Sequence, residues 1–178
     1  MAILVEAISV VVKRSAIDDK FPGGWEAFVE DCPNKTLCAD SSLARVGFMS
    51  PVDVESYVKY LEKNGLVFLE SNEAVDLFVA DQQRGITVKC NWAEFGHVNL
   101  DGDKSKRVAA CQLIEGIEEP LLTPDGWKYE GSLSNTFSFA PTEHVDKSLK
   151  YLRHENGLDV YLNLLTGKEV YSGRTGEK

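Results

Sequence analysis

The chain has 178 residues, of which 43% are hydrophobic, and its 28 acidic and 19 basic side chains give a net charge of −9. A chain of this length buries roughly 70% of its extended surface on folding, so it needs neither a metal nor a disulfide to hold its core. Its acidity argues against nucleic acid as a ligand, because phosphate contacts require clustered Lys and Arg side chains. We expect one domain over residues 1–178, with residues 1–100 and 101–178 as candidate pseudo-repeat halves.

The N-terminal run and the cysteines indicate a cytoplasmic protein. The opening MAILVEAISVVV contains Glu6, lacks a basic leader region and is not followed by a cleavage site. It is also too short to cross a bilayer, which takes about 20 apolar residues. We therefore expect a buried strand over residues 3–12 and no membrane partner. The cysteines include no Cys-x-x-Cys pair and are expected to stay reduced (Cys32, Cys38, Cys90 and Cys111).

Two helices are predicted in the first third of the chain. The stretch GGWEAFVED, residues 23–31, predicts a short helix with Trp25, Phe28 and Val29 facing the core.

The second helix has clearer ends. Ser50 is a natural N-cap, Pro51 suits the first helical position, and Asn64-Gly65 provides a helix exit. Apolar residues between these ends recur at helical spacing and form one stripe (Val54, Val58 and Leu61). The following residues 66–69 predict a buried strand.

Further elements follow in chain order. AVDLFVADQ, residues 74–82, and VKCNWAEF, residues 88–95, predict strands joined through a turn. Residues 104–115 predict a helix, and residues 160–171 predict a final hairpin that turns at Thr166-Gly167. Together these elements predict an α+β fold with a mixed or mainly antiparallel sheet and helices on one face.

Two stretches of the sequence are nearly the same. YVKYLEKNGLVF, residues 57–68, shares Lys-Tyr-Leu and Asn-Gly-Leu with SLKYLRHENGLDVY, residues 148–161. The match extends upstream, where Val54 aligns with Val145 and a PGGW has its counterpart in a PDGW. This pattern predicts two duplicated strand–helix–strand units, the second with a helix over residues 144–154.

No motif in the sequence indicates catalysis. The phosphate-binding, dinucleotide-binding, serine-hydrolase and zinc-protease signatures are all absent. His97, Asp101 and Asp103 resemble metal ligands, but their spacing does not fit a calcium loop, and a turn with Asp103 capping the next helix explains them better. Cys90 lies in an apolar strand pattern, where a thiol is usually inert. We expect no catalytic residue, no metal site and no cofactor.

Seven residues are candidates for contacts with a protein partner. The stretch from residue 53 to residue 81 holds seven carboxylates against two lysines. Beyond it, Arg84 and Trp92 add residue types that are enriched in interface anchors. The alternative is a surface turn over a core Trp92, with an acidity that only keeps the protein soluble. The candidates are Asp53, Glu55, Asp76, Asp81, Arg84, Trp92 and Glu94.

The run LARVGFMSPVDVESYVKYLEKNGLVFLE, followed by AVDLFVADQQRG and CNWAEF, resembles small acidic bacterial proteins of the toxin-immunity type. The similarity covers residues 40–95. It implies a compact cytosolic α+β protein that binds a toxin domain and blocks it. It implies no catalytic residues.

Three hypotheses about function follow. The first is a non-catalytic binding protein, an immunity-type inhibitor that holds a basic toxin domain through an acidic face. The second is a small-molecule-binding protein or enzyme with a pocket between the two repeat units, recognisable by convergent polar groups and a perturbed titratable residue. The third is a homodimer or complex-forming module.

Overall fold

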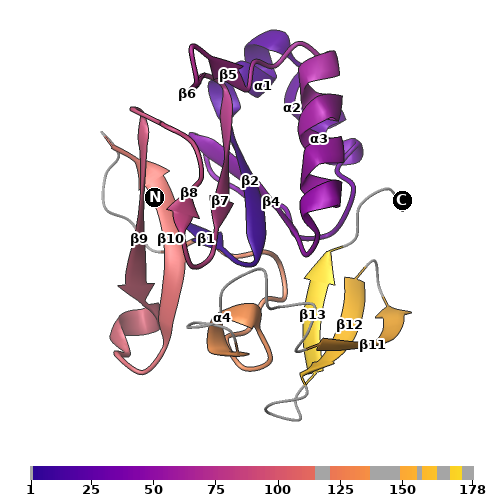
Figure 1. The fold of residues 1–178 in the computed structure, drawn as a ribbon, viewed down its shortest axis with the longest axis vertical. Coiled ribbons are helices and arrows are strands. Elements are labelled where there is room, and N and C mark those ends of the chain that lie inside the picture. Colours follow the sequence, from indigo (N-terminus) through magenta and orange to yellow (C-terminus); the bar gives the residue numbers. More distant parts are fainter. Residues whose placement is uncertain (1, 115–120, 137–148, 156–157, 164–168, 174–178) are drawn as a thin grey trace.

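The structure is a computed structural model that describes residues 2–114, 121–136, 149–155, 158–163 and 169–173 (Figure 1). The elements are β1 (Ile3–Val5), β2 (Ile8–Lys13), α1 (Arg14–Lys20), α2 (Gly24–Glu30), β3 (Cys38–Ala39), β4 (Leu43–Phe48), α3 (Pro51–Lys63), β5 (Leu69–Glu70), β6 (Glu73–Ala74), β7 (Leu77–Asp81), β8 (Gly85–Ile86), β9 (Ala93–Asn99), a 3-10 turn (Leu100–Gly102), β10 (Arg107–Leu113), α4 (Leu133–Thr136), β11 (Leu149–Glu155), β12 (Leu158–Asn163) and β13 (Glu169–Gly173).

Three layers build the main body. The middle layer is a five-stranded sheet in the order β3-β4-β2-β7-β8. Helices α1, α2 and α3 cover one face of this sheet (Figure 1). The other face packs against a three-stranded sheet in the order β1-β10-β9. All of the named strand pairs are antiparallel. The predicted α+β class, with mainly antiparallel strands and helices on one face, is confirmed.

Strand β2 shows why the N-terminal run is apolar on both sides. Alternate residues of a strand point to opposite faces of the sheet. Val10 and Val12 therefore lie in the core beneath the helices, and Val11 lies in the core between the two sheets. All three are fully buried. A strand covered on both faces needs a continuous apolar run rather than an alternating one.

Helix α3 has the ends that its sequence predicts. The Ser50 hydroxyl accepts a hydrogen bond from the Val52 backbone N–H at 3.2 Å, and Pro51 opens the helix. The helix ends at Lys63, and Gly65 adopts φ 98°, a left-handed conformation that glycine takes without steric strain. Its buried residues are the predicted stripe of Val54, Val58 and Leu61, together with Tyr57 beside it.

Helix α2 matches its prediction except at one residue. Phe28 is buried between two aromatic rings. Trp25 stacks on it with ring centroids 5.6 Å apart, and Phe21 packs edge-on against it, also with centroids 5.6 Å apart. Val29, which was expected to face the core, is 41% exposed. A helix this short presents only one face to the sheet, and Phe28 occupies it. Helix α1, directly before it, has no counterpart among the predicted elements.

Three strand predictions need correction. The strand expected over residues 3–12 is divided in two, because the chain changes sheets between β1 and β2. Only Leu69 of the expected buried strand 66–69 enters a strand, as the exposed first residue of β5. The strand expected over residues 88–95 begins only at Ala93.

The helix predicted over residues 104–115 is wrong. Residues Arg107–Leu113 form β10, the central strand of its sheet, with β1 on one side and β9 on the other. Strand pairing on both sides overrides the helix propensity of this alanine-containing segment.

The structure does not confirm the duplication. Leu149–Glu155 forms strand β11, whereas the aligned residues of the first unit lie at the end of α3. The helix expected over residues 144–154 is therefore wrong over residues 149–154, and its first part, residues 144–148, lies outside the described residues. The final hairpin is confirmed, since β12 pairs with β13 in antiparallel register, and its turn also lies outside the described residues.

Candidate functional site

The candidate site is a cavity of about 390 Å³ at the junction between β1 and β2. One wall comes from residues 6–7 of the junction and from β4, and the opposite wall comes from residues 124–128 and 130–133. Lys35 and Thr36, from the loop before β3, complete the lining. Its volume lies within the range of roughly 300–1,000 Å³ that is typical of small-molecule sites.

The break between β1 and β2 shapes the bottom of the cavity. Ala7 adopts φ 47°, a left-handed conformation that disfavours any residue with a Cβ. The Gln82 side chain stabilises it, because its Oε1 accepts the Ala7 N–H at 2.9 Å and its Nε2 donates to the Leu133 carbonyl at 3.1 Å. Gln82 thus connects the break to the opposite wall.

Glu6 is a buried carboxylate at this break, with only 8% of its surface exposed. Its Oε1 accepts a hydrogen bond from Trp127 Nε1, and its Oε2 accepts from the Ser134 N–H at 2.6 Å and the Ser134 hydroxyl at 3.1 Å. Burial raises the pKa of the Glu6 carboxyl, while the nearby Arg45 and these donors oppose the rise. Both carboxylate oxygens therefore hold residues 127–134 against the sheet.

Arg45 is the matching buried cation, with 3% of its surface exposed. Its Nε donates to the Ser9 hydroxyl at 2.9 Å, and its two terminal nitrogens donate to the carbonyls of Thr36 and Glu6, each at 3.2 Å. The guanidinium lies against Gly47, where an added Cβ would come within 2.4 Å of a terminal nitrogen. Glycine at this position of β4 therefore makes room for the arginine.

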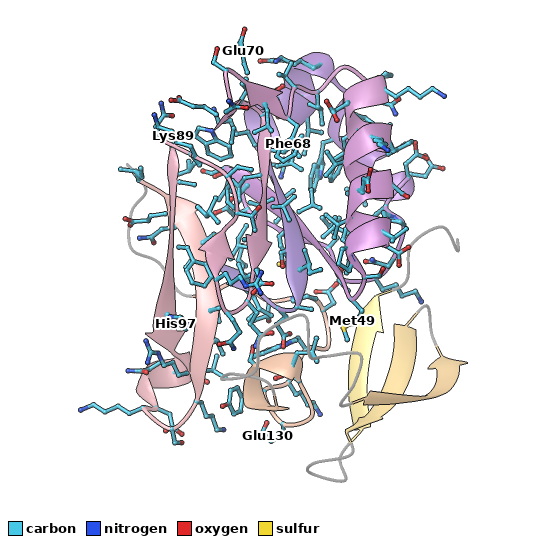
Figure 2. The ribbon with its side chains drawn as sticks, in the orientation of Figure 1. Met49, Phe68, Glu70, Lys89, His97 and Glu130 are labelled. Carbon is cyan, nitrogen blue, oxygen red and sulfur yellow. The ribbon has the colours of Figure 1, made fainter. Side chains whose placement is uncertain are left out.

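The rim of the cavity carries exposed charges. Lys35, Lys128 and Asp125 lie at the rim, and no ion pair involves them among the described residues. The Glu130 carboxylate, which lies low on the body near α4 in Figure 2, pairs with Lys106 Nζ at 2.9 Å. The arrangement has donors and cations for binding, and the buried Glu6 carboxylate at its base already accepts three hydrogen bonds.

The thiols near the core are poor nucleophiles. Burial raises the pKa of Cys38 to about 11 and that of Cys111 to about 12, so both stay protonated at neutral pH. All four cysteines are free thiols, as predicted.

Two of the predicted partner-binding residues are buried. The Asp76 carboxylate pairs with Lys20 Nζ at 2.8 Å and accepts the Val67 N–H at 2.7 Å. The Asp81 carboxylate accepts the backbone N–H groups of Gln83 and Arg84 at 2.8 and 3.1 Å and so closes the turn before β8. Both carboxylates are used inside the fold.

The other five are spread over α3, the turn before β8, the loop before β9 and β9 itself. Asp53 and Glu55 lie on α3, where Glu55 is exposed and pairs with Lys59 at 2.8 Å. Arg84 is exposed on the turn, and Glu94 is exposed on β9, where it accepts a hydrogen bond from Gln112.

Trp92 is half-buried and packs against the core between the two sheets. Its ring packs against Phe78 with centroids 5.2 Å apart, its Nε1 donates to the Ala74 carbonyl at 3.0 Å, and Lys13 Nζ lies 4.3 Å from its ring centroid. These contacts hold the Trp92 ring within the fold.

His97 lies on β9, and residues 101–103 form the turn that the sequence predicts. The Asp103 carboxylate accepts from the Ser105 N–H at 2.9 Å and its hydroxyl at 2.7 Å. It does not cap a helix, because β10 follows. Burial and the nearby Arg107 lower the pKa of His97, which is labelled beside β9 in Figure 2. Among the described residues, no three His, Cys, Asp or Glu side chains gather closely enough to hold a metal.

The sequence reasoning missed the residues that define the cavity. Glu6 and Arg45 each interrupt an apolar strand pattern, MAILVEAISVVV and LARVGF, and a charge in such a run is the available signal of a buried polar contact. The contribution of Trp127 depends on tertiary contacts across more than a hundred residues.

No protein-family model, curated protein or solved structure matches the chain at a significant level. Within the described ranges, every helix is too short or too polar to cross a bilayer.

Proposed function

We propose that this protein is a non-catalytic binding protein that holds a basic protein partner against its helical layer. The observation that carries this proposal is the charge of the layer formed by α1, α2 and α3. These helices bury their apolar sides on the sheet and leave six acidic side chains exposed (Asp18, Asp19, Glu26, Glu30, Glu55 and Glu62).

Few of these charges are neutralised within the layer. Lys20 pairs with the buried Asp76, and Lys59 pairs with Glu55. Lys63 is the remaining exposed lysine of the three helices, and the other five exposed acids form no ion pair within the described part of the chain. The layer is therefore a net acidic surface.

Two apolar side chains add contact area to this layer. Val29 on α2 and Val52 at the start of α3 are 41% and 69% exposed. Glu70, exposed on the β5–β6 hairpin beyond the helices, extends the acidity (Figure 2). Acidic surfaces with apolar contacts suit a basic partner, since complementary charge raises the association rate and selects the partner.

The resemblance of residues 40–95 to toxin-immunity proteins makes a basic toxin domain the first partner to test. In this proposal the protein is an immunity-type inhibitor that covers the basic surface of a toxin.

The test is capture of a partner from the native host at low salt, with charge-matched variants. We expect one stoichiometric basic protein to bind the wild type and to be released as salt rises, because screening weakens exposed charge pairs. Glu62→Lys on α3 should weaken retention about tenfold, and Glu94→Lys on β9, with the same change in net charge, should not. Equal retention by both variants, or a partner insensitive to salt, would contradict the proposal.

A second candidate function is small-molecule binding, and the cavity at the β1–β2 junction favours it. Polar groups converge there, and the pKa of Glu6 is raised. The cavity lies between the sheet and residues 124–133 rather than between two repeat units.

A further inference from the structure

We propose that the cavity at the β1–β2 junction binds a small organic carboxylate with an aromatic or aliphatic body. This proposal develops the second candidate function, and it does not depend on the acidic helical layer. It rests on the unused donors of the cavity, the charges at its rim and the apolar character of its walls.

Arg45 supplies the buried cation. A guanidinium has five N–H groups, and those of Arg45 donate three hydrogen bonds within the described residues. The Cys38 sulfur is the acceptor available to a fourth N–H of Arg45. Within the part of the chain that the structure describes, at least one N–H of Arg45 is left without an acceptor. An arginine held this rigidly loses little entropy when it binds a carboxylate.

Glu6 does not compete for this role. Its two oxygens already accept three hydrogen bonds, from Trp127 and Ser134, and its charge is offset by Arg45. Three of its roughly four acceptor sites are therefore occupied, which leaves little for a ligand cation. The buried pair therefore leaves donors, rather than acceptors, available in the cavity.

The charges at the rim of the cavity also favour an anionic ligand. Lys35 and Lys128 contribute two positive charges and Asp125 one negative charge, while Glu130 is neutralised by Lys106. The net charge of the rim is therefore positive, although the net charge of the whole protein is −9. Negative ligands are thus drawn to this opening and repelled by most of the remaining surface.

The walls determine the rest of the ligand. Phe48, Pro124, Trp127 and Leu133 line the cavity, and the lack of a side chain at Gly47 lets the guanidinium approach. Apolar walls with a few fixed polar groups are the usual composition of a small-molecule site. The body of the ligand should therefore be a flat aromatic or aliphatic group, with its carboxylate toward Arg45.

The experiment compares naphthoate with its neutral isostere naphthamide, using isothermal titration calorimetry on the full chain. We expect naphthoate to bind at least about tenfold more tightly, as a charge-assisted hydrogen bond is roughly twice as strong as a neutral one. Inorganic phosphate, which lacks the apolar body, should bind more weakly than naphthoate.

Exposed rim residues provide variants that leave the core intact. Lys35→Glu/Lys128→Glu should weaken naphthoate binding at least about tenfold and leave naphthamide binding unchanged. Lys59→Glu/Lys63→Glu on α3 changes the net charge equally and should leave both unchanged. Naphthoate that fails to bind, binds no better than naphthamide, or is weakened equally by the α3 variant would overturn the proposal. None of these results bears on the captured protein partner, so the two proposals fail separately.

Discussion

The helix-covered core and the β1–β2 junction are both buried, but they are stabilised in different ways. Beneath the helices the contacts are aromatic and aliphatic, with Phe28, Phe48 and Leu61 almost fully buried. At the junction, buried Glu6, Arg45 and Gln82 are joined by hydrogen bonds across long sequence separations. The first region depends on volume and shape, and the second depends on every polar group having a partner.

This difference indicates which region is available for recognition. An apolar core loses stability when volume is removed, because its contacts depend on close packing of side chains. A buried polar network costs desolvation and is stable only when satisfied, so a donor left over next to a cavity is an opportunity for a ligand. Three substitutions test the comparison.

The largest effect is expected from Phe28→Ala beneath the helices. The change removes a ring that packs between Phe21 and Trp25, and we expect it to lower the free energy of unfolding by about 3–5 kcal/mol. Urea denaturation followed by circular dichroism measures it. The neighbouring Val29→Ala, at an exposed position, should change stability by no more than about 0.5 kcal/mol. Similar losses in both variants would show that α2 is not packed as described.

A smaller effect is expected from Trp127→Phe at the junction. The substitution keeps an aromatic ring but removes the Nε1–H that donates to the Glu6 carboxylate. We expect a loss of about 1–3 kcal/mol, the usual cost of leaving a buried acceptor without its donor. Trp25→Phe is the matched control, because Trp25 contacts Phe28 and Arg14 through its ring face. If Trp25→Phe lowers the free energy of unfolding as much as Trp127→Phe does, the loss of the Trp127–Glu6 hydrogen bond does not explain the destabilisation.

The subtlest effect is a change in how stability depends on pH. The pKa of Glu6 is raised above its usual 4.5 by burial, so the folded state binds a proton more tightly than the unfolded state does. The contribution of this group to stability is complete below pH 4.5 and declines as the pH rises through the folded-state pKa. Glu6→Gln removes that decline.

The measurement is urea denaturation of the wild type and Glu6→Gln over this pH range. We expect the stability of the wild type relative to the variant to fall as the pH rises from 4.5. A difference that stays constant with pH would mean that Glu6 titrates as it does in the unfolded chain.

Local signals in the sequence were sufficient for some elements. Ser50, Pro51 and Gly65 define the ends of α3 without help from distant residues, so its limits are predictable. The hairpin β12–β13 is similarly local. Strand β10 is not, because Val108–Ala110 becomes a strand through its pairing with β1 and β9. The repeated phrase is misleading for the same reason, since similar residues lie in a helix in one copy and in a strand in the other.

The cavity was less accessible to sequence reasoning than the fold. The number of acidic residues is visible in the sequence, but their burial is not. Asp76 and Asp81 are buried and hydrogen-bonded within the fold, whereas Glu62 is exposed. Glu6 and Arg45 were visible as charges in apolar runs. Their pairing with Trp127 and Thr36 requires the three-dimensional structure.

The pairing of β1 with β10 also determines when the protein can fold. Ile3 of β1 pairs with Cys111 of β10, which is added to the growing chain more than a hundred residues later. At a synthesis rate of about 5–20 residues per second, β1 waits roughly 5–20 s for its neighbour. During that interval an apolar strand has no ladder partner, which makes the nascent chain a natural substrate for chaperones.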